Sequence, residues 1–143
     1  MSSVEVHVVT PEREVWAGEA ESVIAHGVDG EVGILTGHAP MMVQLAIGPL
    51  RILREGEPEL RAVIDGGFMH VTSAPADEGA PSGTRVDVLA SSAELADDID
   101  VEAARARAAE LEERLSQRDR DEDETAGIEA ESKKALARID IGG

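Results

Sequence analysis

Short apolar runs with a period of two, separated by turn residues, fill the first two thirds of the chain. Val4, Val6 and Val8 alternate with Glu5 and His7, which is the pattern of a strand with one buried face. Further strands are expected at 14–17, 20–26, 32–35, 41–47, 50–53, 59–64, 68–72 and 85–90. Turn signals lie between them at GVDGE (27–31), Gly48-Pro49, EGEP (55–58) and Asp65-Gly66-Gly67. This spacing predicts a β-sandwich of about ten antiparallel strands.

The hydrophobic period changes near residue 98. Acidic residues precede an apolar stripe with three-four spacing, so Asp100 is the expected N-cap of a helix. The stripe consists of Val101, Ala104, Ala108, Leu111 and Leu115. A second helix is expected over about 124–139, with an apolar side formed by Ile128, Ala135, Leu136 and Ile139. The pattern predicts a β-sandwich domain at 1–98 and an antiparallel two-helix hairpin at 99–143.

Both helical stripes are narrow and rich in alanine, so the hairpin buries little apolar area. We therefore expect it to be held loosely and to be a candidate for movement.

Composition limits the partners. The 143-residue chain has a formal net charge of −17, one Trp, one Phe and no Tyr. Phosphate binding needs clustered Lys and Arg, so nucleic acid and insertion into an anionic lipid surface are not expected. Residues 1–99 hold 17 acidic and 5 basic side chains, whereas 100–143 hold 13 and 8, which concentrates the bases in the tail. The sequence has no cysteine, no signal-peptide pattern and no long apolar run, so a soluble cytoplasmic chain is expected.

Chemical motifs are missing from the glycine-rich stretch 27–48 and from the rest of the chain. The stretch contains no GxxxxGK[ST] phosphate-binding loop, and no GxSxG nucleophile elbow occurs. The four histidines have no metal-ligand spacing. We therefore expect neither an active site nor a metal site, and interpret the glycines as turn residues.

Six blocks carry a resemblance to a known family. They are TPER (10–13), VWAGEA (15–20), DGEVGILTGHAPMM (29–42), LxxGPLRI (45–52), DGGFMHV (65–71) and VDVLASSAELADDIDVEAA (86–104). Through them the chain resembles, nearly end to end, the epsilon subunits of bacterial F-type ATP synthases, and the GILTGHAP block is the most specific.

The resemblance implies a non-catalytic rotor component at the cytoplasmic face of the bacterial plasma membrane, peripheral to it. In this family the sandwich binds the gamma subunit and the ring of c subunits, and so couples proton flow to rotation. The helical hairpin lies folded on the sandwich or extends into the alpha/beta hexamer, where it hinders ATP hydrolysis.

The resemblance also implies a set of contact residues. The partner-binding positions are Gly30, Glu31, Gly33, Gly37, His38, Ala39, Pro40, Met41, Met42, Gly66, Gly67 and Phe68. On the hairpin, the basic side chains Arg105, Arg107, Arg114 and Arg118 are expected to face acidic surfaces of the hexamer, or else to pair locally and keep the helix soluble.

Some members of the family bind ATP on the hairpin through an IDxxRA motif. Ile99 and Asp100 match it, but Ala103 stands in place of the arginine, and Arg105 lies about 200° around the helix. Asp100 and Arg105 are therefore weak nucleotide candidates, and no cofactor is expected. The segment SAPADEGAPSGT (73–84) is longer than the usual turn there. Two alternatives stay open: a free ATP-binding regulatory module, and an acidic β-sandwich adaptor.

Overall fold

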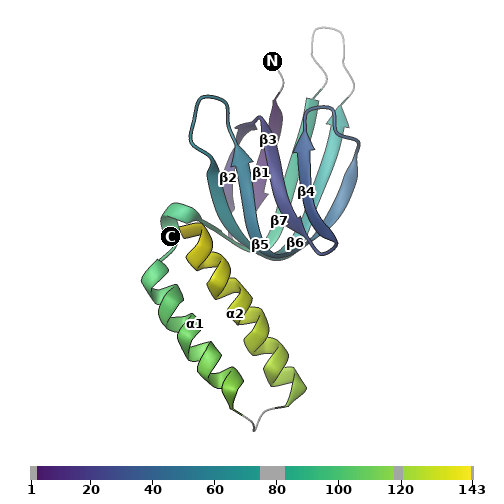
Figure 1. Ribbon diagram of the computed structural model, residues 1–143. Coiled ribbons are helices and arrows are strands. Elements are labelled where there is room, and N and C mark those ends of the chain that lie inside the picture. Colours follow the sequence, from purple (N-terminus) through teal and green to yellow (C-terminus); the bar gives the residue numbers. More distant parts are fainter. Residues whose placement is uncertain (1–2, 75–82, 118–120, 143) are drawn as a thin grey trace.

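The computed structural model of the chain describes residues 3–74, 83–117 and 121–142. The described residues form seven strands, a short 3-10 helix and two α-helices (Figure 1). The strands are β1 (Val4–Val9), β2 (Glu14–Ala20), β3 (Ser22–Gly27), β4 (Gly30–Leu35), β5 (Met41–Leu53), β6 (Leu60–Ala74) and β7 (Gly83–Leu95). The helices are η1 (Ala96–Asp98), α1 (Val101–Ser116) and α2 (Glu122–Gly142).

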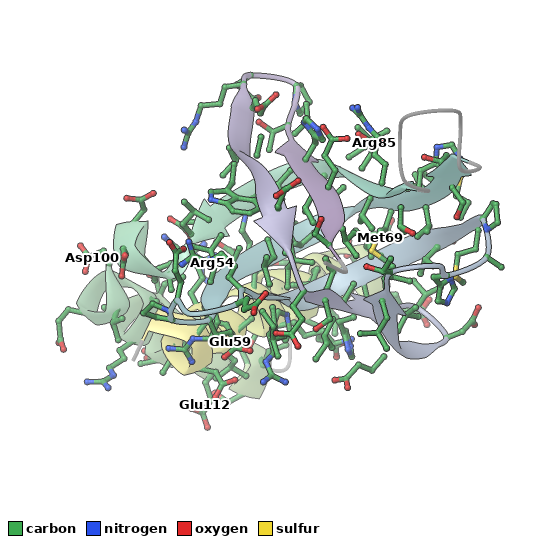
Figure 2. All side chains as sticks on the ribbon, turned by 90° about the horizontal axis from the view of Figure 1, so that it is seen from above. Arg54, Glu59, Met69, Arg85, Asp100 and Glu112 are labelled. Atoms are coloured by element: carbon green, nitrogen blue, oxygen red, sulfur yellow. The ribbon has the colours of Figure 1, made fainter. Side chains whose placement is uncertain are left out.

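The strands form one hydrogen-bonded sheet, in the order β2-β1-β7-β6-β5-β3-β4, which folds over on itself. The long strands β5, β6 and β7 run through both layers and bend between them. Because side chains alternate along each strand, the inner faces supply a core of Val, Ile, Leu, Ala and Met. Met69 has no exposed surface and lies within the sandwich, whereas Glu112 lies at the rim of the molecule (Figure 2).

The prediction of a β-sandwich followed by a two-helix hairpin is confirmed, but about ten strands is too many for the part of the chain described. Gly48-Pro49 lies inside β5 and Asp65-Gly66-Gly67 inside β6, where turns were expected. Gly66 and Gly67 have φ of +67° and +106°, and a Cβ on Gly67 would overlap the backbone of Leu89. These glycines therefore let a continuous strand bend and approach its neighbour closely, and do not end it.

The expectation of antiparallel strands is wrong for one pair. β1 lies parallel to β7, from the pair Val4 and Thr84 to the pair Val9 and Leu89, and the other pairings are antiparallel. The alternation of valines in β1 sets which face is buried, but it is the same for either direction of pairing.

The two helices pack against each other through their apolar stripes. Ala104 and Leu111 of α1 are fully buried, and Ile128, Ala135 and Ile141 of α2 are nearly so. Across the stripe, the Arg107 guanidinium binds both carboxylate oxygens of Glu131 at 2.8 Å. This bidentate contact lowers the pKa of Glu131 from its ordinary value.

Side-chain caps define where the helices begin. The Asp100 carboxylate accepts a hydrogen bond from the Ala103 N–H at 3.0 Å, which confirms it as the N-cap of α1. Asp121 accepts from the Glu124 N–H at 2.7 Å, so α2 begins at Glu122, two residues before the predicted start. Leu136 is expected in the apolar stripe of α2, but it is 56% exposed and lines an open groove between α2 and β5.

The hairpin extends from the bent end of the sandwich (Figure 1). Its second helix, α2, lies against β5 and β6. Val63 of β6 is 2% exposed although it belongs to no part of the sandwich core, which fits its position under α2.

Candidate partner-binding site

The GHAP loop, residues 37–40, spans from β4 in one layer to β5 in the other at the end of the sandwich remote from the hairpin (Figure 1). Two hydrogen bonds fix it to the ends of β6 and β7. The Gly37 N–H donates to the Thr84 hydroxyl at 2.8 Å, and the Ser73 hydroxyl donates to the His38 carbonyl at 2.8 Å. Gly37 has φ of +87°, a conformation that favours glycine.

The loop is therefore both exposed and rigidly placed. His38 Nδ1 lies 2.8 Å from the Ala39 carbonyl, which can only accept, so the ring proton is on Nδ1. In the neutral ring, Nε2 is then left as a hydrogen-bond acceptor. Ala39 and Pro40 are exposed. Such a loop can receive a partner without paying a large ordering entropy on binding.

Three large apolar side chains lie on the outer face of the layer that contains β5, β6 and β7. Phe68 is directly opposite Leu89, and Met42 is diagonal to Phe68 through the pairs Met42–His70 and Gln44–Phe68. Met42, Phe68 and Leu89 are 61%, 47% and 52% exposed. We call these three residues the outer apolar patch. Contiguous exposed apolar side chains of this kind mark protein–protein contacts.

The predicted residues Gly30, Glu31 and Gly33 lie on the edge strand β4, and all three are exposed. The β3–β4 turn packs beside the first residues of β5, and a groove of about 220 Å³ separates the two. Met41 and Met42 line the same groove. The structure thus brings the start of β4 close to one edge of the outer apolar patch.

Gly66 and Gly67 have a different surrounding. They lie at the bend of β6 and are partly buried, so the structure gives them a role in shaping the strand next to Phe68. The GHAP loop and the start of β4 lie at opposite ends of β4, so the predicted residues do not form one compact site.

Arg105, Arg107 and Arg114 pair with carboxylates of the hairpin itself. Arg105 lies 3.3 Å from Glu102, and Arg114 lies 3.3 Å from Glu110. Arg107 contacts Glu131 across the two helices. In this conformation these three arginines are thus paired within the hairpin, Arg138 pairs with Glu94 of the sandwich, and Arg118 lies outside the described residues.

The nucleotide candidates are also occupied by local contacts. The Asp100 carboxylate caps α1, and the Arg105 guanidinium pairs with Glu102. Of the long segment 73–84, residues 75–82 lie outside the described ranges. Within the part of the chain described, no three His, Asp or Glu side chains are gathered in a way that could hold a metal ion.

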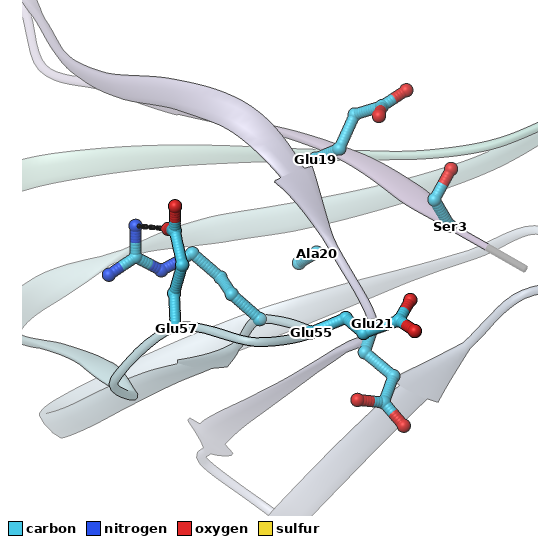
Figure 3. A pocket seen from close by; sticks show the side chains of 7 residues that line it. Ser3, Glu19, Ala20, Glu21, Glu55 and Glu57 are labelled. Atoms are coloured by element: carbon cyan, nitrogen blue, oxygen red, sulfur yellow. Dashed lines mark hydrogen bonds and ion pairs between the residues drawn. The ribbon is translucent and has the colours of Figure 1, made fainter.

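An acidic pocket of about 270 Å³ lies between the end of β2 and the β5–β6 connection (Figure 3). Its carboxylates are those of Glu19, Glu21, Glu55 and Glu57. Arg54 donates to Glu57 at 2.6 Å, which neutralises part of this charge. Solvated carboxylates with one paired arginine suggest no catalytic arrangement.

Sequence reasoning missed two residues of the candidate site, Leu89 and Thr84. Leu89 is apolar at a position where the alternation of β7 places polar side chains, with Arg85 and Asp87 on the same face. That departure from the pattern was a readable signal. Nothing in the sequence around Thr84 indicates that its hydroxyl holds the GHAP loop, because only the fold places it beside Gly37.

Fold and surface together define a β-sandwich protein that carries a helical hairpin against one end and an exposed apolar patch suited to a protein partner. The sequence model of the family described as "ATP synthase, Delta/Epsilon chain, beta-sandwich domain" matches residues 3–96. The chain belongs to this ATP synthase delta/epsilon chain family.

Relatives agree with this assignment over most of their length. The ATP synthase epsilon chain of Brevibacillus brevis is 44% identical over 118 residues, which cover 82% of each chain. That of Thermobifida fusca is 50% identical over 103 residues, 71% of this chain and 69% of the relative. The epsilon chain of Bacillus velezensis is 36% identical over 143 residues, which cover 100% of this chain and 99% of the relative.

The fold is shared with a chain of the Euglena gracilis mitochondrial ATP synthase, determined by cryo-electron microscopy in an OSCP/F1/c-ring assembly. The TM-score is 0.75 at 22% identity, over 96% of this chain and 79% of that one. Neither of the described helices is long and apolar enough to cross a membrane.

Proposed function

We propose that this chain is the epsilon subunit in the central stalk of a bacterial F-type ATP synthase. It is a non-catalytic rotor component that couples proton translocation to ATP synthesis, and it works at the cytoplasmic face of the plasma membrane. Its sandwich, residues 1–98, binds the gamma subunit and the c ring, and its hairpin, residues 99–143, regulates hydrolysis.

The outer apolar patch carries this proposal. Met42, Phe68 and Leu89 present apolar surface on a rigid sheet, and nothing in the described chain covers it. Because each side chain is already about half covered, a partner that buries the rest gains roughly 1 kcal/mol for each, about half of the value for full burial. We assign this patch, together with the GHAP loop, to the gamma subunit.

The c ring is assigned to the start of β4 and the β3–β4 turn. Glu31 and Gly33 are exposed there, and the edge strand has unpaired backbone groups that a neighbour can meet. This turn and the outer apolar patch belong to one rigid sandwich, which is suited to transmitting torque because packed β-layers deform little.

For the hairpin, we propose that it leaves the sandwich and enters the alpha/beta hexamer, where it inhibits ATP hydrolysis. Its contact with the sandwich comes mainly from α2, and the ion pairs of Arg105 and Arg114 within the hairpin are exposed and exchangeable. Two docked states of similar energy are what such a brake requires.

The gamma assignment is tested with a single charge in the patch. Phe68→Asp is expected to weaken gamma binding at least tenfold, because a carboxylate would be desolvated in the contact. The matched control is Leu136→Asp, since Leu136 is similarly exposed but lies on the hairpin. Binding to purified gamma subunit is measured by calorimetry; equal affinity of the two variants contradicts the assignment.

The brake is tested by deleting residues 100–143. The truncated chain is expected to assemble with the rotor and to raise the ATP hydrolysis rate of the complex. An unchanged rate, with normal assembly, contradicts inhibition by the hairpin while leaving the gamma assignment intact.

A further inference from the structure

The two parts of the chain carry charge of the same sign, so the folded-back hairpin is opposed by electrostatic repulsion. Residues 1–99 have 17 acidic and 5 basic side chains, and residues 100–143 have 13 and 8. Docking of one part on the other needs local pairs of opposite charge or a large apolar contact.

Charge is segregated along α2. The first ten residues of the helix, 122–131, contain five carboxylates and no basic side chain. The three bases Lys133, Lys134 and Arg138 follow within two turns, and no acid lies between them. The basic half of α2 is the part that meets acidic side chains of the sandwich.

Two of these bases form ion pairs across the interface. Arg138 donates to both oxygens of Glu94 on β7, at 2.7 and 2.9 Å. Lys134 lies 3.3 Å from the Asp65 carboxylate on β6 and donates to the Ser92 hydroxyl at 3.1 Å.

The Arg138–Glu94 pair has the geometry of a strong contact. The two side chains are only 27% and 30% exposed, and a bidentate guanidinium–carboxylate pair is stronger than a single contact. Lys134 and Arg138 are four residues apart, so they lie on the same face of the helix.

The apolar part of the interface is incomplete. A groove of about 540 Å³ stays open between α2 and the segment 46–49 of β5, and Leu136 at its border is more than half exposed. Val63 is buried, and the apolar residues of α2 that line the groove are three alanines and Leu136. The ion pairs therefore carry a large share of the hold on the hairpin.

We propose that Lys134 and Arg138, with Asp65 and Glu94, form an ionic latch that holds the hairpin against the sandwich and sets how often it is released. This inference rests on the proposed function only for its consequence, since release is what the brake requires. The latch itself is a property of the isolated chain.

The test is single-molecule fluorescence transfer in the full-length chain, which counts docked and released molecules. The natural sequence has no cysteine, so Glu12→Cys and Glu112→Cys, both at exposed positions, place one dye on the sandwich and one on α1. All latch variants are made in this background.

Arg138→Gln is expected to raise the ratio of released to docked molecules about fivefold, which corresponds to an ion pair that stabilises the docked state by about 1 kcal/mol. Glu94→Gln removes the other partner of the same pair and is expected to raise the ratio equally. The matched control is Lys133→Gln, because Lys133 is on the same helix but forms no ion pair with the described part of the sandwich. It is expected to change the ratio less than twofold.

The decisive variant reverses the pair. Arg138→Glu alone is expected to release the hairpin further, and adding Glu94→Arg restores docking at the original composition and charge. Reversal is preferred to a salt titration, because salt screens both the latch and the overall repulsion. The latch is overturned if Arg138→Gln and Glu94→Gln behave like Lys133→Gln, or if the double reversal fails to restore docking. Neither outcome depends on hydrolysis, so the latch and the brake can fail separately.

Discussion

Leu111→Ala tests whether the hairpin is held together by one buried leucine. Leu111 of α1 has no exposed surface and belongs to the apolar stripe through which the two helices pack. Its removal deletes three buried carbon groups, at about 0.8 kcal/mol each, or about 2.4 kcal/mol before any cavity is counted. The remaining cavity brings the expected loss to about 3 kcal/mol.

A loss of about 3 kcal/mol is large for the stability of a hairpin of two helices. The other fully or nearly fully buried residues between the helices include two alanines, Ala104 and Ala135, which contribute little area. Isolated helices of this length are marginal in water. We therefore expect the hairpin to open without unfolding the sandwich.

Native-state hydrogen exchange measures this directly, amide by amide. In Leu111→Ala, the amides of α1 and α2 are expected to exchange about 60- to 150-fold faster, since each 1.4 kcal/mol is a factor of ten. Core amides of β6 and β7 are expected to change less than twofold. Glu112→Ala, at the exposed neighbouring position, is the control. Equal acceleration of sandwich and helix amides would refute the reasoning, as would unchanged helix amides.

Three further outcomes follow from single contacts. Gly67→Ala is expected to lower the thermal midpoint by several degrees, because its φ is +106° and its Cβ would meet the Leu89 backbone; a midpoint within one degree of wild type contradicts this. The pKa of Glu131 is lowered by Arg107, so the pair stabilises the hairpin above the ordinary pKa of 4.5 and loses this effect as pH falls through the lower folded value. The stability difference between wild type and Glu131→Gln, followed by circular dichroism, should therefore shrink on acidification and not grow. Asp100→Ala is expected to cost about 1 kcal/mol of helix stability through the lost cap, while calorimetry with ATP stays flat for both proteins. Heat of binding lost in this variant would instead favour an ATP-binding module.

The sequence by itself determined the fold class and much of the local structure. Alternating valines in β1 and the three-four stripe around Leu111 required a half-buried strand and an amphipathic helix, and the structure has both. Asp100 could be predicted as the N-cap because a carboxylate directly before a helical apolar pattern can accept a hydrogen bond from a free backbone N–H of the first turn. These features depend on neighbours within a few residues, so the sequence is sufficient to reveal them.

Only the tertiary structure decided which strands are continuous and which exposed residues share a surface. Gly66 and Gly67 have the same local preference in a turn as in a bend, so the strand count could not be settled from their identity. Leu89 meets Phe68 through strand register, and Thr84 meets Gly37 through a contact between residues 47 positions apart. The latch pairs likewise join α2 to β6 and β7. Such contacts are set by how the sheet folds over, which no local pattern encodes.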